Sequence, residues 1–257
     1  MVNESEFSAK SYLISGAASG VGADICRELL NHGAYVYALD FNESALKKLE
    51  KDMNLPSSLK TICTDISSEI SVKTAIQSLN FPGDKLDGLV NAAAVVNAKR
   101  FADFDQSDWE KTFSTNLFGT YYLIKYLTPF LINSDSPKIV NFASMAGKIA
   151  GQYTAPYAAS KAAIISLTRS AAIALAPKVN VNSICPGIIE TPMWDVLGSD
   201  LEKVGIKDHF NNRSSQSPLA RAGKSMEVAH ATLFLLSNAA NYITGEDLNI
   251  SGGLVMH

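Results

Sequence analysis

Cysteine and histidine are scarce in this sequence, and their scarcity excludes several classes of protein. Cys26, Cys63 and Cys185 are odd in number and far apart in a chain of 257 residues, so neither a disulfide framework nor a Cys-x-x-Cys site is indicated. The four histidines have no metal-ligand spacing, and we expect no metal. Isolated cysteines are typical of a reducing compartment, which predicts a cytoplasmic protein.

Long apolar runs and an excess of one charge sign are also lacking. No unbroken apolar run reaches the roughly 20 residues of a membrane span, and the start Met-Val-Asn-Glu-Ser-Glu lacks the order of a signal peptide. The net charge is −3 with both signs dispersed, which argues against a nucleic-acid surface. The expected partner is a small molecule, with no nucleic acid and no membrane.

What the sequence does have is a regular alternation of short apolar runs and helical stretches, with 47% apolar residues. The expected strands are 12–15, 35–39, 59–64, 88–91, 138–142, 179–184 and 247–250, and the main expected helices are 23–31, 42–53, 70–79, 107–132, 156–174 and 226–236. Such alternation implies parallel pairing with right-handed crossovers. It predicts one α/β domain over 1–257, a doubly wound, Rossmann-type parallel sheet of about seven strands with helices on both faces.

A glycine-rich turn follows the first strand. Gly16, Gly20 and Gly22 stand directly before the first helix, and a backbone without Cβ atoms at a helix amino terminus forms a phosphate site. The spacing G-x-x-x-G-x-G differs from the more usual G-x-G-x-x-G, and no P-loop lysine follows. Alone, the turn fits an ordinary loop equally well.

Asp40 ends the second strand, where a nucleotide-binding fold places its acidic residue. A carboxylate there accepts both hydroxyls of an adenine ribose and repels a 2′-phosphate. No Arg or Lys stands at 17–19 or at Phe41 to attract such a phosphate. The sequence therefore favours NAD over NADP, unless Asp40 only caps the helix that begins near Asn42.

Three further polar residues lie in expected elements or at their ends. Asp65 follows the third strand and either meets an adenine amino group or starts a turn. Asn91 ends the fourth strand, and the three alanines after it leave room for a flat ligand. Asn116 lies between apolar residues of the helix at 107–132, where the simplest explanation is a satisfied structural hydrogen bond.

The centre of the chain combines a strand ending, a serine and a tyrosine–lysine pair. Ser144 follows the strand at 138–142, and Tyr157 and Lys161 share one face of the next helix. An ammonium near a phenol stabilises the phenolate, so we expect Lys161 to lower the pKa of Tyr157 towards neutrality. The spacing alone is weak, because Tyr121 and Lys125 repeat it.

The segment 190–218 has no strong period and predicts a mobile substrate lid or, alternatively, a surface flap. The side chains expected to line a substrate pocket are Ser144, Gln152, Tyr153, Met193 and Trp194. Lys207, His209 and Arg213 either bind a substrate carboxylate or are solvated surface charges.

In this order and spacing, the motifs resemble the short-chain dehydrogenase/reductase family from about Ser11 to Gly253. The matching pieces are Ser15 to Gly22, Asp65-Ile66, Asn91-Ala-Ala, Asn116, Ser144 with Tyr157 and Lys161, and Pro186-Gly187 with Thr191. Two positions depart from the family pattern: Ser15 replaces the more frequent Thr, and Ala93 replaces a glycine and adds a methyl group near the cofactor.

The resemblance implies roles for these residues. Tyr157 is expected as the general acid and base, Ser144 orients the substrate oxygen, Lys161 holds the nicotinamide ribose, and Asn116 holds a water in a proton relay. The implied cofactor-binding residues are Gly16, Ser19, Gly20, Val21, Gly22, Asp40, Phe41, Asp65, Ile66, Asn91, Ala92, Ala93, Tyr157, Lys161, Pro186, Gly187, Ile189 and Thr191.

The function implied is hydride transfer between a secondary alcohol, such as a diol, polyol or cyclic hydroxy compound, and NAD. The alternatives are an NADPH-dependent carbonyl or 3-oxoacyl thioester reductase and a catalytically silent nucleotide-binding protein. A serine hydrolase is disfavoured because Ser144 is not in a G-x-S-x-G turn. The family resemblance also implies a homo-oligomer, a tetramer or a dimer.

Overall fold

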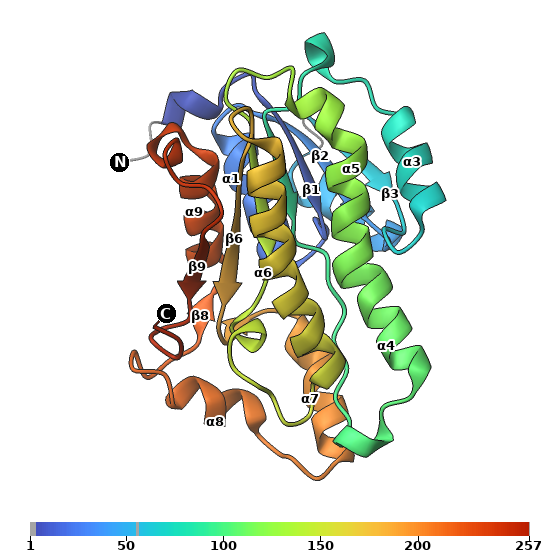
Figure 1. Cartoon of the computed structure of the whole chain (residues 1–257), viewed down its shortest axis with the longest axis vertical. Helices are drawn as coiled ribbons and strands as arrows, with labels where there is room; N and C mark the ends of the chain where they lie inside the picture. The colour runs from blue at the N-terminus through green and yellow to red at the C-terminus, as the bar shows by residue number, and fades with distance from the viewer. Residues whose placement is uncertain (1–3, 55–56, 257) are drawn as a thin grey trace.

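A sheet of seven parallel strands forms the centre of the computed structural model, which describes residues 4–54 and 57–256 (Figure 1). Its strand order is β3-β2-β1-β4-β5-β6-β9, and every neighbouring pair is parallel. The strands are β1 (Ser11–Ser15), β2 (Tyr35–Asp40), β3 (Leu59–Cys63), β4 (Gly88–Asn91), β5 (Lys138–Phe142), β6 (Asn180–Pro186) and β9 (Asp247–Ile250). The predicted doubly wound fold is confirmed.

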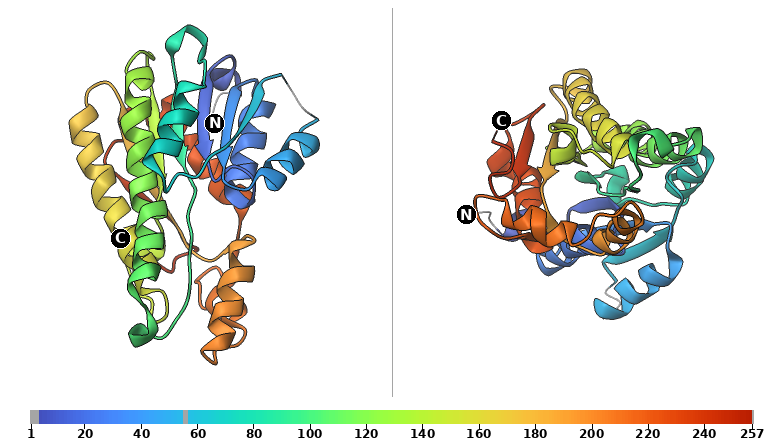
Figure 2. Two further views of the ribbon diagram at one scale, coloured as in Figure 1. Left: turned by 90° about the vertical axis from the view of Figure 1, so that its right-hand side faces the viewer. Right: turned by 90° about the horizontal axis from the view of Figure 1, so that it is seen from below.

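Helices cover both faces of this sheet (Figures 1 and 2). They are α1 (Gly20–Asn31), α2 (Glu43–Asp52), α3 (Glu69–Gln77), α4 (Gln106–Phe113), α5 (Thr120–Leu131), α6 (Ala155–Leu175), α7 (Met193–Lys203), α8 (His209–Ser215) and α9 (Ser225–Leu236). Buried side chains of α1, α2 and α9 form one apolar layer with the sheet, and those of α3, α5 and the end of α6 form the other. The central strands are therefore apolar on both faces, as the continuous apolar runs predicted.

Short elements complete the chain. The 3₁₀ helices are Glu4–Phe7, Pro82–Asp84, Phe101–Asp103, Met145–Gly147 and Asn238–Ala240, and a separate two-stranded sheet pairs β7 (Ile189–Glu190) with β8 (Gly223–Lys224). The direction of chain progression across the main sheet reverses between β1 and β4. In doubly wound folds the carboxyl ends of the strands at such a reversal border the ligand site.

Most of the segment 190–218 is helical, which its weak period did not predict. It forms α7 and α8, which lie beyond the carboxyl ends of β6 and β9 at the bottom of Figure 1 and nearest the viewer in the right-hand view of Figure 2. On α7 only Leu197 and Leu201 are buried, while Val196 is 57% exposed. An apolar face this narrow does not produce a clear helical pattern.

The helix predicted over 107–132 is divided into α4 and α5 by a π-helical turn, Ser114–Gly119. A π turn leaves main-chain groups without their usual helical partners and is frequent at functional sites. It holds Asn116, which is fully buried.

Among the described helices, α6 is long and apolar enough by length and composition to cross a membrane, with a mean hydropathy of 1.2 over 18 residues. The expectation concerned unbroken apolar runs, and it holds for α6 because Lys161 and Arg169 interrupt this helix. Ile164 and Ala171 on α6 are buried in the apolar clusters of the fold, and a core helix passes the same test.

Candidate active site

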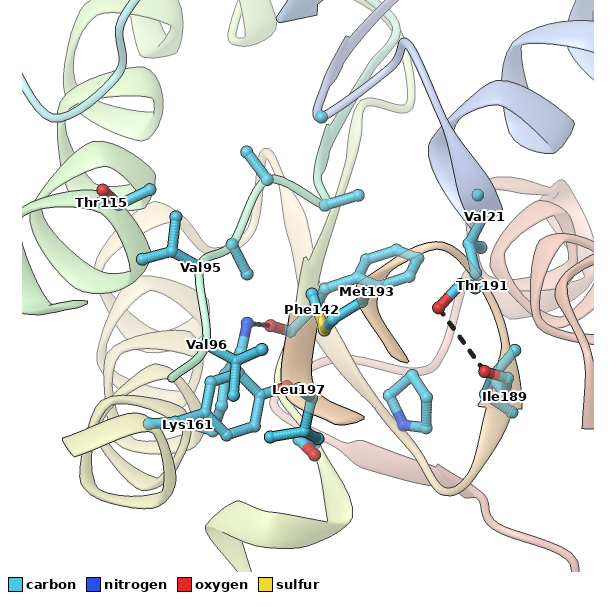
Figure 3. A pocket seen from close by; sticks show the side chains of 18 of the residues that line it. Val21, Val95, Val96, Thr115, Phe142, Lys161, Ile189, Thr191, Met193 and Leu197 are labelled. Atoms are coloured by element: carbon cyan, nitrogen blue, oxygen red, sulfur yellow. Dashed lines mark hydrogen bonds between the residues drawn. The ribbon is translucent and has the colours of Figure 1, made fainter. Parts of the chain in front are cut away.

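A cavity of about 1210 Å³ opens at the carboxyl ends of the strands and extends from the glycine turn to α7 and α8. Of the predicted catalytic, cofactor and substrate residues, all line it except Asn91 and Asn116. Figure 3 shows Val21 and Thr191 bordering it on one side, and Val96 and Lys161 on the other. The structure thus brings together residues from nearly the whole length of the chain.

The glycine turn leaves its backbone open to a ligand. A Cβ atom on Gly22 would lie 2.1 Å from the carbonyl oxygen of Gly16, so the turn and the first turn of α1 pack backbone against backbone. Ser19, the residue preceding α1, makes no side-chain hydrogen bond to the helix. The first amide groups of α1 are therefore uncapped, as an anion-binding helix terminus requires.

Asp40 presents its carboxylate at the edge of the same cavity. One oxygen accepts a hydrogen bond from the amide of Ala18 at 3.1 Å, and the other accepts one from the amide of Asn42 at 3.0 Å. The side chain of Asn42, not that of Asp40, caps α2 by accepting a bond from Ala45. The capping explanation for Asp40 was wrong, and its carboxylate remains suited to a ribose.

Asp65 and Asn91 are placed differently from one another. Asp65 lines the cavity and also starts a turn, since its Oδ1 accepts bonds from the amide and hydroxyl of Ser67. Asn91 lies outside the cavity lining and is 2% exposed. Its amide group donates to Oδ1 of Asn141 at 2.8 Å, so it ties β4 to β5.

Ser144, Tyr157 and Lys161 converge at the centre of the cavity. The hydroxyl oxygen of Ser144 accepts a bond from the amide of Ala146 at 3.1 Å, which orients it, and both Ser144 and Tyr157 line the cavity. Nζ of Lys161 donates to the carbonyl oxygen of Phe142 at 2.6 Å (Figure 3). It lies 5.7 Å from the centre of the Tyr157 ring. A phenol, a hydroxyl and an amine therefore border one space.

The pKa of Tyr157 was predicted with the wrong sign. Burial raises the pKa of the phenol, and the side chain of Ser144 opposes that rise only in part. Burial also lowers the pKa of Lys161 to about 8. The amine donates to the carbonyl oxygen of Phe142, and the burial of the phenol is the larger influence on its pKa.

Asn116 has no free side-chain donor. Its Oδ1 accepts a bond from the amide of Val95 at 2.8 Å, and its amide group donates to the carbonyl of Val95 and the hydroxyl of Ser160, both at 3.0 Å. The explanation as a structural hydrogen bond is therefore correct for the side chain. A water in a proton relay would have to use the main-chain carbonyl of the π turn.

The opposite end of the cavity is mainly apolar. Met193, Trp194, Gln152 and Tyr153 line it as predicted. Sequence reasoning missed other lining side chains, among them Val95, Val96, Ile149, Leu197 and Leu201. Val95 and Val96 directly follow the alanines after β4. Their position near the carboxyl end of a strand could have indicated that they line the cavity. His209 and Arg213 also line the cavity, whereas Lys207 is exposed outside it.

The residues present fit a nicotinamide dinucleotide. The glycine turn with its uncapped helix suits the pyrophosphate, Asp40 suits a ribose, and Ala92 and Ala93 leave a flat wall beside them. A Cβ atom on Gly16 would lie 2.6 Å from the amide nitrogen of Ala93, so the glycine turn packs closely on the backbone after β4.

Comparison with known proteins places the chain in a family. The family model described as enoyl-(acyl carrier protein) reductase matches residues 16–255. The 3-oxoacyl-(acyl-carrier-protein) reductase FabG of Thermotoga maritima is 32% identical over 249 residues, 96% of this chain and 98% of that protein. The NAD-dependent glycerol dehydrogenase of Listeria innocua is 34% identical over 250 residues, 95% and 93% of the two chains.

A solved structure shows the same likeness in three dimensions. The glucose/ribitol dehydrogenase of Brucella melitensis superposes with a TM-score of 0.88 at 34% identity, covering 98% of this chain and 99% of that one. The chain therefore belongs to the short-chain dehydrogenase/reductase family and is an NAD(P)-dependent oxidoreductase acting on CH–OH groups.

Proposed function

We propose that the protein transfers a hydride between the carbinol carbon of a secondary alcohol and NAD, with Tyr157 as the general acid and base. The observation that carries the proposal is the convergence of Ser144, Tyr157 and Lys161 in one cavity with the glycine turn and Asp40. When bound, the nicotinamide supplies the redox chemistry, and the protein supplies position and a proton.

Each of the three side chains has a separate task. Ser144, whose hydroxyl is oriented by the amide of Ala146, donates a hydrogen bond to the substrate oxygen. Tyr157 takes the alcohol proton during oxidation and returns it during reduction. Lys161, fixed on the carbonyl of Phe142, places its remaining donors beside the ribose of the nucleotide. Together they hold the reacting oxygen against the phenol.

A substrate panel with both cofactors tests the reaction. We expect a diol, a polyol, a cyclic diol or a hydroxy acid to reduce NAD, with kcat/KM rising with pH in the alkaline range. Burial raises the pKa of Tyr157, so the phenolate that accepts the proton forms only as pH rises. Carbonyl reduction needs the protonated phenol and should persist at neutral pH and fall at alkaline pH. A flat pH profile in both directions would contradict the role of Tyr157.

The preference for NAD rests on Asp40. In Asp40→Asn the uncharged amide no longer repels a 2′-phosphate and binds the ribose more weakly, so the ratio of kcat/KM for NAD to that for NADP should fall roughly 10- to 100-fold. Asp52→Asn is the control, because Asp52 is an exposed carboxylate paired with Lys48 on α2. A wild-type enzyme that prefers NADP, or an unchanged ratio in the variant, would refute the assignment.

An NADPH-dependent carbonyl or 3-oxoacyl thioester reductase is the second candidate. It is supported by the similarity to the Thermotoga maritima reductase, and the apolar cavity end around Met193 and Leu197 suits an acyl chain. The carboxylate of Asp40 opposes it. A third candidate, a catalytically silent nucleotide-binding protein, is excluded if any alcohol steadily reduces the cofactor.

We also propose that the chain acts as one dinucleotide-binding and catalytic domain that assembles as a tetramer or dimer. In this proposal 190–218, with α7 and α8, is the lid over the substrate. Phe118 is 46% exposed and Tyr121 44% exposed, and a second copy of the chain would remove these rings from water. The free thiols of Cys26, Cys63 and Cys185 fit a reducing compartment such as the cytoplasm.

A further inference from the structure

Two basic side chains, His209 and Arg213, line the cavity from α8, although hydride transfer itself gives them no role. Both are partly buried. Among the described residues no carboxylate lies within 4.0 Å of the Arg213 guanidinium, whose one side-chain partner is Oε1 of Gln216 at 3.2 Å. A guanidinium held against a cavity without a counter-ion has most of its donors left for a ligand.

Packing holds this pair in position. His209 and Arg213 are one helical turn apart and share a face of α8. Phe210 packs edge-on against Trp194 with ring centres 5.1 Å apart, and the Trp194 and His209 rings lie 6.1 Å apart. Ser214 is buried and bonds back to the carbonyl of Phe210 at 2.8 Å. Phe210 and Ser214 therefore anchor the helix, the Trp194 ring positions His209, and the guanidinium of Arg213 is not needed for this packing.

The acidic side chains of the cavity lie at one of its ends, whereas its basic side chains also include Lys111 on α4 and Lys161 on α6. The acidic lining residues are Asp40 and Asp65, which belong to the nucleotide end beside the glycine turn, and none comes from α7 or α8. Burial lowers the pKa of His209, and the charge of Arg213 lowers it further. At neutral pH the imidazole is therefore an uncharged donor or acceptor, and the guanidinium carries the positive charge.

We propose that α8 carries an anion subsite and that the substrate is a hydroxy or oxo compound bearing a carboxylate or phosphate group, bound by Arg213 with His209 as a second donor. The inference rests on the proposed function, since it places the reacting carbon between Ser144 and Tyr157. A planar guanidinium binds either anion through two parallel hydrogen bonds. The neutral polyol handled by a related dehydrogenase would leave that guanidinium without a partner.

Matched substrates test this subsite. One arm compares 3-hydroxybutanoate with its methyl ester, and the other compares sorbitol 6-phosphate with sorbitol. In Arg213→Gln we expect kcat/KM for the preferred anion to fall about 10- to 100-fold, mainly through KM, and that for its neutral partner to change less than about 2-fold. Arg213→Lys keeps the positive charge but cannot form two parallel hydrogen bonds, so its kcat/KM for the anion should fall less than that of Arg213→Gln. Lys207→Gln is the control, because Lys207 is exposed outside the cavity.

Calorimetric titration of the same compounds into the Tyr157→Phe variant with NAD separates this inference from the proposed function. Anion binding that Arg213→Gln weakens about tenfold or more supports the subsite even if the wild-type enzyme turns over no alcohol. Whether 3-hydroxybutanoate or sorbitol 6-phosphate binds decides between a carboxylate and a phosphate as the ligand group. Equal kcat/KM for anionic and neutral partners, unchanged by Arg213→Gln, would overturn the subsite while leaving the hydride transfer intact.

Discussion

Replacing Tyr157 with phenylalanine should lower kcat by about 10²- to 10⁴-fold in both directions, the usual contribution of a positioned acid or base. The substitution removes one oxygen, the group that exchanges the proton, and keeps the ring that packs beside Lys161. Affinity for NAD should change less than about 3-fold, because the glycine turn and Asp40 are untouched. Steady-state kinetics measures the loss, and calorimetric titration of the cofactor measures the affinity.

Tyr121→Phe is the matched control for this experiment. Tyr121 and Lys125 stand at the same spacing, with Nζ 6.0 Å from the ring centre, but Tyr121 is 44% exposed and Lys125 pairs with Glu69 at 2.7 Å. We expect wild-type kinetics from this variant. Near-wild-type turnover in Tyr157→Phe with the cofactor bound would show that another group exchanges the proton.

The two tyrosine–lysine pairs show what could be predicted from the sequence. Their local geometry is nearly the same, 5.7 Å against 6.0 Å from amine to ring centre, so spacing alone does not separate them. The position of Ser144 after a buried strand does, because the carboxyl ends of parallel strands share one edge of the sheet. Strand patterns therefore located Tyr157 at the cavity, and the resemblance to a family supplied its expected role.

The features that sequence reasoning missed all depend on tertiary burial. The pKa of Tyr157 is raised because neighbouring elements exclude water from the phenol, and no spacing along the chain reports that. The bonds of Asn116 to Val95 and Ser160 join three segments distant in sequence. Arg213 was indistinguishable from exposed Lys207 until α8 was seen beside the cavity. The roles of these residues depend on which side chains are buried, and the local sequence pattern does not show that.

Substituting Gly22 with alanine should remove most cofactor binding and destabilise the fold. Its Cβ would lie 2.1 Å from the carbonyl oxygen of Gly16 and 3.1 Å from Cα of Ala17, and backbone atoms cannot yield as a flexible side chain does. Relief requires separating α1 from the glycine turn, which spoils the anion site and costs roughly 1–3 kcal/mol of unfolding free energy, or more. We expect the Kd for NAD to rise at least about tenfold in calorimetric titration, with a lower urea midpoint.

Gly198→Ala gives the contrast that assigns this effect to the site. Gly198 is also a helical glycine, in α7, but a Cβ there meets nothing within 4 Å. The same change should therefore stabilise the protein by about 0.5–1 kcal/mol through helix propensity and leave the Kd unchanged. If Gly→Ala destabilises the protein at position 22 and stabilises it at position 198, the loss of stability in Gly22→Ala comes from the close backbone packing at that site. Unchanged NAD affinity in Gly22→Ala would mean that the pyrophosphate binds elsewhere, and the roles given to Asp40 and Tyr157 would fall with it.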